Sequence, residues 1–410
     1  MRSTKLTLSD VVRRRMCTGC GACVFACPPG MVSLRDVISS GLRPVFNGGC
    51  GDSEQYADIC PGARTTADLA EVACTGSKIQ DPYLGSFMEQ WEGWAADPSI
   101  RMQGSSGGLL TALALYCIEA GGMAGVLHSG MDPDKPWCNR TVLSCSREEI
   151  IRNAGSRYSP ASPCEGLDLV ESAERPCAFI GKPTDATAVQ LLRKVNPELH
   201  GKLGLIMSFF CAGTPSMQGT LDLLHKLDIN PEELVFLRYR GNGWPGGFEV
   251  ITKDGRRAFV PYDEAWSCLS HYKPIRENLD PDSFGRNADI SCGDAWHIKD
   301  REGNSGVSVA VVRTEIGRSI IHTAEKAGYV VLRSVAPEQI LAGQRYLVDK
   351  QRELYGRLLA LRVFNIPHTE FTGFALKASW HQLPYLKRVK TLLGTVRRII
   401  KRRLWKAVDY

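Results

Sequence analysis

The sequence predicts an α+β or α/β protein with a small cysteine-rich domain, an α/β body and a basic C-terminal helix. Four cysteines are crowded near the N-terminus, strands and helices alternate through the middle of the chain, and positive charge is concentrated after residue 374. The chain has 410 residues, of which 43% are apolar and 23% are charged. It is therefore long enough for two or three ordinary globular domains.

The N-terminal cysteines Cys17, Cys20, Cys23 and Cys27 form the run Cys-x-x-Cys-x-x-Cys-x-x-x-Cys-Pro. This spacing is typical of bacterial ferredoxins, in which three of the thiolates bind one [4Fe-4S] cluster and the fourth serves a second cluster. Structural zinc sites usually pair two Cys-x-x-Cys units across a longer loop, which this run lacks. Residues 1–75 are therefore predicted to form a ferredoxin-like iron–sulfur domain.

A second copy of the motif is expected between Cys50 and Cys60, and it is incomplete. Its first and last cysteines are in register, but Ser53 and Tyr56 stand at the two middle positions. In the two-cluster pattern the last cysteine of each copy binds the cluster of the other copy. We therefore expect one [4Fe-4S] cluster. Its predicted ligands are Cys17, Cys20, Cys23 and Cys60, with Cys27 as the rival fourth ligand.

Alternating strands and helices predict an α/β body over residues 86–345. Strands are expected at 124–127, 141–145, 177–180, 203–210, 307–313 and 329–333. Helices are expected at 109–120, 186–195, 216–227 and 318–327. Residues 346–373 are expected to form a helical extension of this body.

Polar turns in the body are candidates for holding a phosphate-bearing cofactor. Ser106, Gly107 and Gly108 open the helix at 109–120, where free backbone N–H groups can hold a pyrophosphate. The turn between the strand at 177–180 and the next helix is where open α/β sheets place ligands. Arginines among glycines are suited to phosphate. Such turns also cap helices without any ligand. The remaining candidates are Lys182, Thr184 and Asp185 on this strand-to-helix turn, and the arginines Arg157 and Arg240.

Six segments of the body together resemble one family. They are Ser106–Gly108, Gly155–Pro160, Phe179–Pro183, Phe210–Ser216, Tyr239–Gly246 and Ala288–Trp296. The resemblance covers roughly residues 10 to 345 and is to the coenzyme F420 hydrogenase/dehydrogenase beta-subunit family, which includes the 7-hydroxymethyl chlorophyll a reductases. It implies an FAD-binding iron–sulfur oxidoreductase, in which electrons pass between clusters and a deazaflavin coenzyme or another reducible organic substrate.

The chain departs from this family at one place. Many members bind a further cluster in the body through four cysteines, and the corresponding positions here are Thr184, Cys211, Glu277 and Asp280. Carboxylate oxygens are harder ligands than thiolates and hold iron–sulfur clusters poorly. The body cluster is therefore expected to be absent, and the chain is identified as a divergent member.

Catalytic residues are not evident from the sequence, because redox cofactors carry such chemistry themselves. His271, Asp294 and His297 are weak candidates for proton donors, and each is more often structural. A ferredoxin or another electron donor is the expected partner.

Residues 374–410 form a basic tail that holds ten Lys or Arg residues and one acid. Apolar residues recur there at spacings of three and four and predict one helical face: Leu386, Val389, Leu393, Val396, Ile400 and Leu404. Such a helix can lie on an anionic membrane surface, pack on its own domain or dock on an acidic protein. Binding of nucleic acid is not expected, because the basic patch does not extend beyond the tail.

The chain has fifteen cysteines, with a cluster of them at ligand spacing, which favours a reducing compartment over a disulfide scaffold. A cytoplasmic protein is therefore expected, peripheral on the membrane if the tail docks there. Two functions are compatible with these observations. The first is an iron–sulfur flavoprotein oxidoreductase. The alternative is a non-catalytic or electron-delivery accessory protein in cell-surface polysaccharide biosynthesis.

Overall fold

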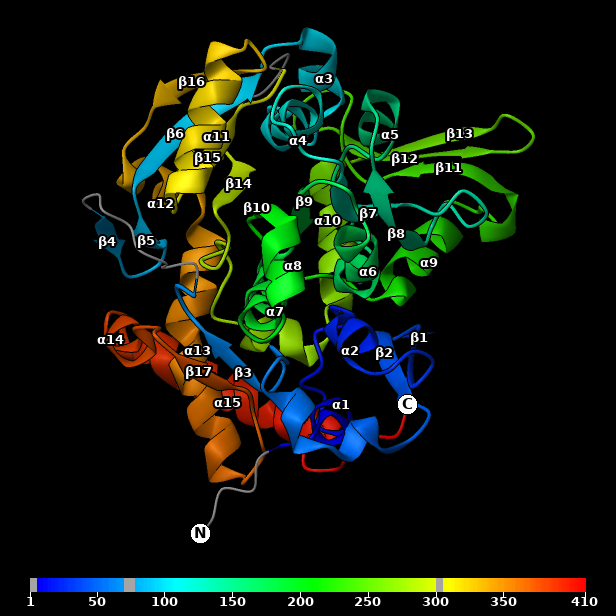
Figure 1. The fold of residues 1–410 in the computed structure, drawn as a ribbon. Helices are drawn as coiled ribbons and strands as arrows, with labels where there is room; N and C mark the ends of the chain where they lie inside the picture. The colour runs from blue at the N-terminus through cyan, green and yellow to red at the C-terminus, as the bar shows by residue number, and fades with distance from the viewer. Residues whose placement is uncertain (1–5, 70–77, 300–304) are drawn as a thin grey trace.

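The computed structural model describes residues 6–69, 78–299 and 305–410 (Figure 1). Within these residues the largest element is an eight-stranded sheet in the order β16-β6-β15-β14-β10-β9-β7-β8. β9 is parallel to β7 and β10, and β14 is parallel to β10. Antiparallel strands complete both edges, so the sheet is mixed. The strands are β6 (Glu89–Ala95), β7 (Val126–Met131), β8 (Asn139–Ser144), β9 (Cys177–Gly181), β10 (Leu203–Phe209), β14 (Ile290–Asp294), β15 (Ser308–Val312) and β16 (Val330–Ser334).

Helices cover both faces of this sheet. Successive side chains of a strand point to opposite faces, and on β10 Leu205 and Met207 belong to one apolar core while Ile206, between them, belongs to another. The first core contains α4 (Leu109–Glu119) and α11 (Glu315–Lys326). The second contains α6 (Leu167–Glu171), α7 (Pro183–Val195) and α8 (Pro197–Lys202).

The parallel strands end along one edge of the sheet. β9 ends at Gly181, β10 at Phe209 and β14 at Asp294. Loops at the carboxyl ends of parallel strands are where open α/β sheets bind ligands. The N-terminal domain lies against this edge, beneath α7 in Figure 1.

The N-terminal domain consists of short elements joined by loops. An antiparallel hairpin follows two short helices, and a capping box between Thr7 and Asp10 begins the first helix. The elements are α1 (Leu8–Arg13), α2 (Ala22–Ala26), β1 (Val32–Val37), β2 (Gly41–Phe46) and β3 (Arg64–Thr66).

A second sheet packs with two helices into a separate core on the side of β8. It is antiparallel and has the order β11-β12-β13. These elements are β11 (Leu234–Arg238), β12 (Gly247–Thr252), β13 (Arg257–Pro261), α9 (Met217–Lys226) and α10 (Tyr262–Leu269). Short elements complete the body: β4 (Ile79–Asp81), β5 (Gly85–Phe87), α3 (Pro98–Gln103), α5 (Arg147–Arg152) and α12 (Pro337–Gly343).

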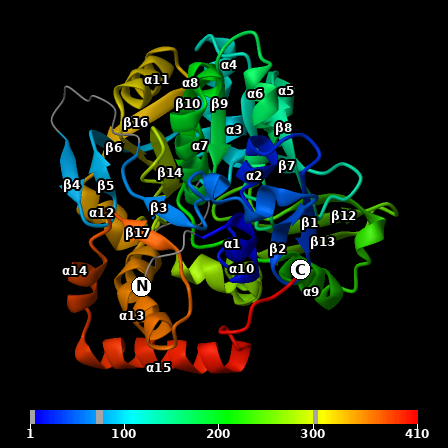
Figure 2. The same cartoon turned by 60° about the horizontal axis from the view of Figure 1, so that its bottom comes forward.

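The C-terminal segment returns to the N-terminal domain. α13 (Arg345–Val363) leads to β17 (Glu370–Thr372), which pairs in parallel with β3. α14 (Leu376–His381) and α15 (Tyr385–Arg402) follow, and Figure 2 shows α15 along the bottom of the molecule. Beyond α15, the Val408 N–H donates to the Arg13 carbonyl at 2.9 Å. The basic tail is thus packed on the protein along one side.

The expected elements of the body are present with shifted ends. The helix expected at 186–195 begins earlier, at Pro183, because proline fits the first turn of a helix. The central strand β14 and the second sheet were not predicted. The boundary expected at residue 75 lies outside the described residues.

The tail helix departs from the predicted single apolar face. Leu404 is buried and Val389 and Val396 are half-buried, whereas Leu386, Leu393 and Ile400 are exposed. One half of the predicted face therefore packs inward and the other half faces solvent. In the described part of the chain, no helix combines the length and apolar character needed to cross a membrane.

Candidate functional site

Four cysteine thiols line one small cavity in the N-terminal domain. They belong to Cys17, Cys20, Cys23 and Cys60. The first three come from the loop before α2 and from α2 itself, and the fourth follows the 3-10 turn that ends at Ala57. The other walls are mostly apolar and include Leu8, Val11, Val12, Leu34, Pro44 and Ile59. The cavity therefore brings the thiols together in surroundings that exclude water.

Backbone N–H groups point at three of these sulfurs. The Gly19 N–H donates to Cys17 Sγ at 3.4 Å. The Ala22 N–H donates to Cys20, and the Gly62 and Ala63 N–H groups donate to Cys60. Such hydrogen bonds favour the thiolate and tune the potential of a bound iron–sulfur cluster.

The thiols disfavour one another's ionisation. Burial raises the pKa of Cys60 to about 12, and the neighbouring Cys20 and Cys17 contribute to the increase. Burial and the same neighbours raise the pKa of Cys23 well above its ordinary value. Four thiolates in one apolar cavity therefore need cationic charge among them, which iron supplies.

The donor set of four thiols in one mostly apolar cavity suits an iron–sulfur cluster. Among the residues described, no three His, Cys, Asp or Glu side chains converge at the distance of a single metal ion. A [4Fe-4S] cube lies between its four thiolates and keeps them farther apart than one ion does. The residues present thus fit the cluster that the motif predicts.

Cys27 lies outside this cavity. It is buried beside Cys50 in an apolar group that includes Val32, Phe46 and Tyr56. Burial raises the pKa of Cys27 to about 12, and a hydrogen bond with Cys50 adds to the increase. The cavity is thus lined by Cys60 and not by the rival Cys27, while Cys23 and Cys60 also pack against the group that holds Cys27, and the ligand set stays a prediction.

The loops that carry the thiols are tied to the body by hydrogen bonds to their carbonyls. The Lys182 ammonium donates to Thr18 O at 2.9 Å, and Ser162 Oγ donates to Gly19 O at 2.8 Å. The Cys164 N–H donates to Cys20 O at 3.1 Å. Arg276, only 2% exposed, donates to Met16 O at 3.1 Å. The cavity is therefore held at the carboxyl edge of the sheet.

Cys164 is a buried thiol near the cavity that was not predicted, because it belongs to no motif. It is hydrogen-bonded to Cys20 and lowers the pKa of Cys20 to about 6, against the burial that raises it. The Cys164 thiol itself contacts Asp185 O at 3.7 Å. It lies where the cluster loop meets the first turn of α7.

The positions that correspond to the family's body cluster surround a group of charges. Thr184 Oγ1 is buried and has no hydrogen-bond partner among the residues that the structure describes. The Glu277 carboxylate accepts a hydrogen bond from the Thr214 N–H at 3.0 Å. Burial raises the pKa of Cys211 to about 11, and the negative charge of Glu277 contributes to the increase. Asp280 pairs with Arg276 at 3.0 Å. Lys182 lies among these groups: burial acts to lower its pKa, but the Asp185 and Glu277 carboxylates raise it above its ordinary value.

The glycine–serine turn before α4 is occupied by contacts within the protein. Ser106 Oγ donates to Val307 O at 2.8 Å, and the Gly107 N–H donates to Ser308 Oγ at 2.9 Å. A side chain on Gly107 would lie 2.8 Å from Gly93 O. Gly108, with φ of 69°, is the N-cap of α4. These residues hold α4 against β6 and β15.

The two arginines predicted to bind phosphate also have protein partners. Arg157 donates to the carbonyls of Pro136, Cys138 and Leu237 at 2.6, 3.1 and 3.0 Å. Arg240 forms a two-bond ion pair with Asp294, at 2.9 and 2.7 Å. The residues selected for flavin are therefore engaged with described parts of the protein, apart from the Thr184 hydroxyl, and flavin binding stays a prediction.

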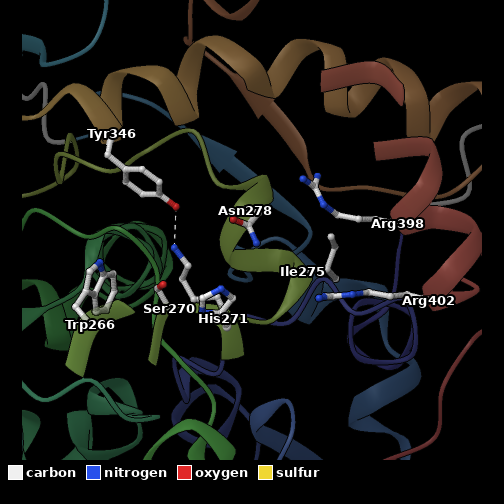
Figure 3. A pocket seen from close by; sticks show the side chains of 9 residues that line it. Trp266, Ser270, His271, Ile275, Asn278, Tyr346, Arg398 and Arg402 are labelled. Atoms are coloured by element: carbon white, nitrogen blue, oxygen red, sulfur yellow. Dashed lines mark hydrogen bonds between the residues drawn. The ribbon is translucent and has the colours of Figure 1, made fainter. Parts of the chain in front are cut away.

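The three candidate proton donors lie in different surroundings. Asp294 is held by Arg240 and by the Trp244 indole N–H at 2.9 Å. His297 Nε2 is 2.6 Å from Glu92 Oε1. His271 lies in a pocket of about 240 Å³ between α10, α13 and α15 (Figure 3). The other side chains that line this pocket are Trp266, Ser270, Lys273, Ile275, Asn278, Tyr346, Arg398 and Arg402.

Comparison with protein families gives three matches along the chain. Residues 11–33 match a 4Fe-4S binding domain. Residues 90–167 match the N-terminal part of the coenzyme F420 hydrogenase/dehydrogenase beta subunit, and residues 175–338 match its C-terminal part. The matches cover the cysteine motif and most of the large sheet but not α13 to α15.

Individual relatives are redox-enzyme subunits. The coenzyme F420 hydrogenase subunit beta of Methanosarcina barkeri is 27% identical, over 69% of this chain and 98% of that protein. The F420-dependent formate dehydrogenase 1 subunit beta of Methanococcus maripaludis is 24% identical, over 60% of this chain and 61% of that protein. A chain of the F420-reducing [NiFe] hydrogenase complex from Methanosarcina barkeri shares the fold, with a TM-score of 0.56 and 22% identity, over 72% of this chain and 100% of that chain.

Proposed function

The chain belongs to the coenzyme F420 hydrogenase/dehydrogenase beta-subunit family, and from this premise we propose that it is an iron–sulfur oxidoreductase with a single [4Fe-4S] cluster. The observation that carries the proposal is the cavity in which Cys17, Cys20, Cys23 and Cys60 meet. These thiols would hold the cluster, and a bound cluster supplies one-electron transfer.

The residues around the cavity would keep the cluster dry and fixed in place. The apolar walls exclude water, and the N–H groups of Gly19 and Ala22 favour the thiolates. Lys182 and Arg43 bring positive charge near Cys17 and partly offset the effect of its burial on the pKa. Such charges favour the reduced, more negative state of a cluster.

The electron donor and acceptor are proposed from the relatives. Those proteins are named as subunits of F420 enzymes, so we propose a protein donor such as a ferredoxin and, as acceptor, a deazaflavin coenzyme or another organic compound. FAD on the body is part of this proposal through the family resemblance only. Because most of the predicted flavin residues are engaged with the protein, no step is assigned to that cofactor. The features described do not favour an accessory role in polysaccharide biosynthesis.

The test is purification of the full chain without oxygen, followed by analysis of iron, sulfide and released flavin. The proposal expects about four irons and four sulfides per chain and a visible absorption that bleaches on reduction. A folded but colourless protein would refute it. Flavin analysis of the same sample tests the FAD component separately, since the cluster and the flavin would occupy different parts of the molecule.

A second proposal concerns the outer face of α15. Leu386 and Leu393 are 72% and 65% exposed, and Tyr385 and Trp405 are exposed near the two ends of the helix. Lys390, Arg397 and Lys401 are exposed on the same helix. Apolar side chains flanked by cations complement an anionic lipid surface better than they complement another protein of similar charge. We therefore propose that this face docks on anionic membrane.

A further inference from the structure

The pocket between α10, α13 and α15 is lined by cations, and no acidic side chain is among the described residues that form its wall. Lys273, Arg398 and Arg402 line it together with His271, Asn278 and the aromatic rings of Trp266 and Tyr346. Figure 3 shows Tyr346 and Trp266 at one end, the two arginines of α15 at the other, and Asn278 between them. Three positive charges in one concave site, one on a buried lysine and two on exposed arginines, favour a ligand with more than one negative charge.

Lys273 is a buried cation without a carboxylate partner. Its residue is 8% exposed, and its ammonium donates to Tyr346 Oη at 2.8 Å and to Ala212 O at 3.2 Å. Both acceptors are neutral, and in the described chain no carboxylate lies within ion-pair distance of this ammonium. Taking an ammonium out of water without an anion is unfavourable, so the site is electrostatically incomplete.

The two arginines are one helical turn apart on α15, and neither forms an ion pair with a described residue. Burial lowers the pKa of Arg398 below its ordinary value, and the neighbouring positive charges of Arg357 and Arg402 lower it further. The same positive field reaches Tyr346: burial acts to raise its pKa, but Lys273, Lys350 and Arg357 lower it. Guanidinium groups bind phosphate oxygens in pairs of hydrogen bonds.

The volume of the pocket limits the size of the ligand that it can hold. A pocket of about 240 Å³ holds roughly eight water molecules, which is less than drug-sized ligand sites provide and too little for a dinucleotide. A phosphate monoester carries close to two negative charges at neutral pH, whereas a carboxylate carries one. A small phosphate monoester therefore matches both the charge and the volume.

We propose that this pocket binds a small phosphate monoester, with its phosphate between the ammonium of Lys273 and the guanidinium groups of Arg398 and Arg402. Arg398, Arg402 and Tyr346 all lie beyond residue 338, where the match to the family ends. The site is therefore a feature that the C-terminal helices add to the family's body. It does not depend on the proposed redox function, because it concerns binding alone.

The experiment is isothermal titration calorimetry on the full-length protein with glycerol 3-phosphate and with the soluble lipid dihexanoyl phosphatidic acid. Arg398→Gln with Arg402→Gln is expected to weaken binding of the better ligand by at least about thirtyfold, since each lost charge-assisted contact is worth about tenfold. The control is Arg257→Gln with Lys326→Gln, which removes the same charge from exposed positions that line neither the pocket nor the outer face of α15. The control should stay within about twofold of the wild type.

Preference for one ligand identifies the source of the phosphate. Tighter binding of the glycerol ester assigns the pocket to a soluble metabolite, and tighter binding of the lipid assigns it to a phospholipid headgroup. The proposal is overturned if neither ligand binds with a Kd below about 10 mM, or if the control pair weakens binding as much as the pocket pair. Circular dichroism of both double variants shows whether α15 is intact.

Discussion

Replacing Cys60 and Cys27 one at a time by alanine separates the two possible ligand sets. Cys60 lines the cavity with the three motif cysteines, whereas Cys27 is 4% exposed, does not line the cavity and is hydrogen-bonded to Cys50. Cys60→Ala is expected to lower the iron content of anaerobically purified protein from about four to three or fewer per chain. Cys27→Ala is expected to keep about four irons.

Cys27→Ala is expected to affect packing rather than iron content. Cys27→Ala removes a buried sulfur from contact with Val32 and Phe46, which corresponds to a loss of about 1 kcal/mol in the free energy of unfolding. Iron and sulfide analysis measures the first effect and denaturant titration the second. The reasoning is wrong if Cys27→Ala loses iron while Cys60→Ala retains it.

Three further predictions concern other parts of the molecule. Burial lowers the pKa of His128 to about 4 from an ordinary value of about 6.5, so the folded state resists protonation of this side chain. The free energy of unfolding should therefore fall by about 2 kcal/mol between pH 7.5 and pH 5. His128→Gln should remove that part of the pH dependence in denaturant titrations. Arg276→Met leaves the Asp280 carboxylate buried and unpaired, so the free energy of unfolding should fall by about 3–5 kcal/mol. Adding Asp280→Asn should restore part of this loss. A decrease of less than about 1 kcal/mol would contradict the pairing. Leu386→Glu with Leu393→Glu should leave the fold intact and weaken co-sedimentation with phosphatidylglycerol vesicles at least about tenfold, whereas unchanged sedimentation would remove the proposal for α15.

Much of the body could be predicted because its elements carry local patterns. The helix at Leu109 follows glycines and is uniformly apolar, and the strand at Cys177 is a short buried run between turn residues. β14 was missed because its residues Ile290–Asp294 include serine, glycine and aspartate, which are uncommon in strands. Its position is fixed by pairing with β10 and β15, and a local pattern does not contain that information.

The site residues differ in the same way: some belong to a local sequence motif, and others meet only through the folding of distant segments. The choice of Cys60 over Cys27 followed from the doubled motif, and in the structure Cys60 lies with the other three thiols. The predicted roles of Arg157 and Arg240 rested on charge and neighbouring glycines, and their partners come from distant strands and loops. Lys273, Tyr346 and Arg398 meet only through the packing of α13 and α15, so no sequence spacing relates them.

The ties between the cysteine loops and the body also bear on how the protein is made. The partner of Thr18 is 164 residues away in sequence and that of Met16 is 260 residues away. At ribosomal rates Arg276 is synthesised about 10 to 50 s after Met16. A fragment that ends before Arg276 would carry all four thiols without the guanidinium that holds the loops on either side of them. The ferredoxin-like segment is thus less self-sufficient than its motif implies, and we expect it to assemble together with the rest of the chain.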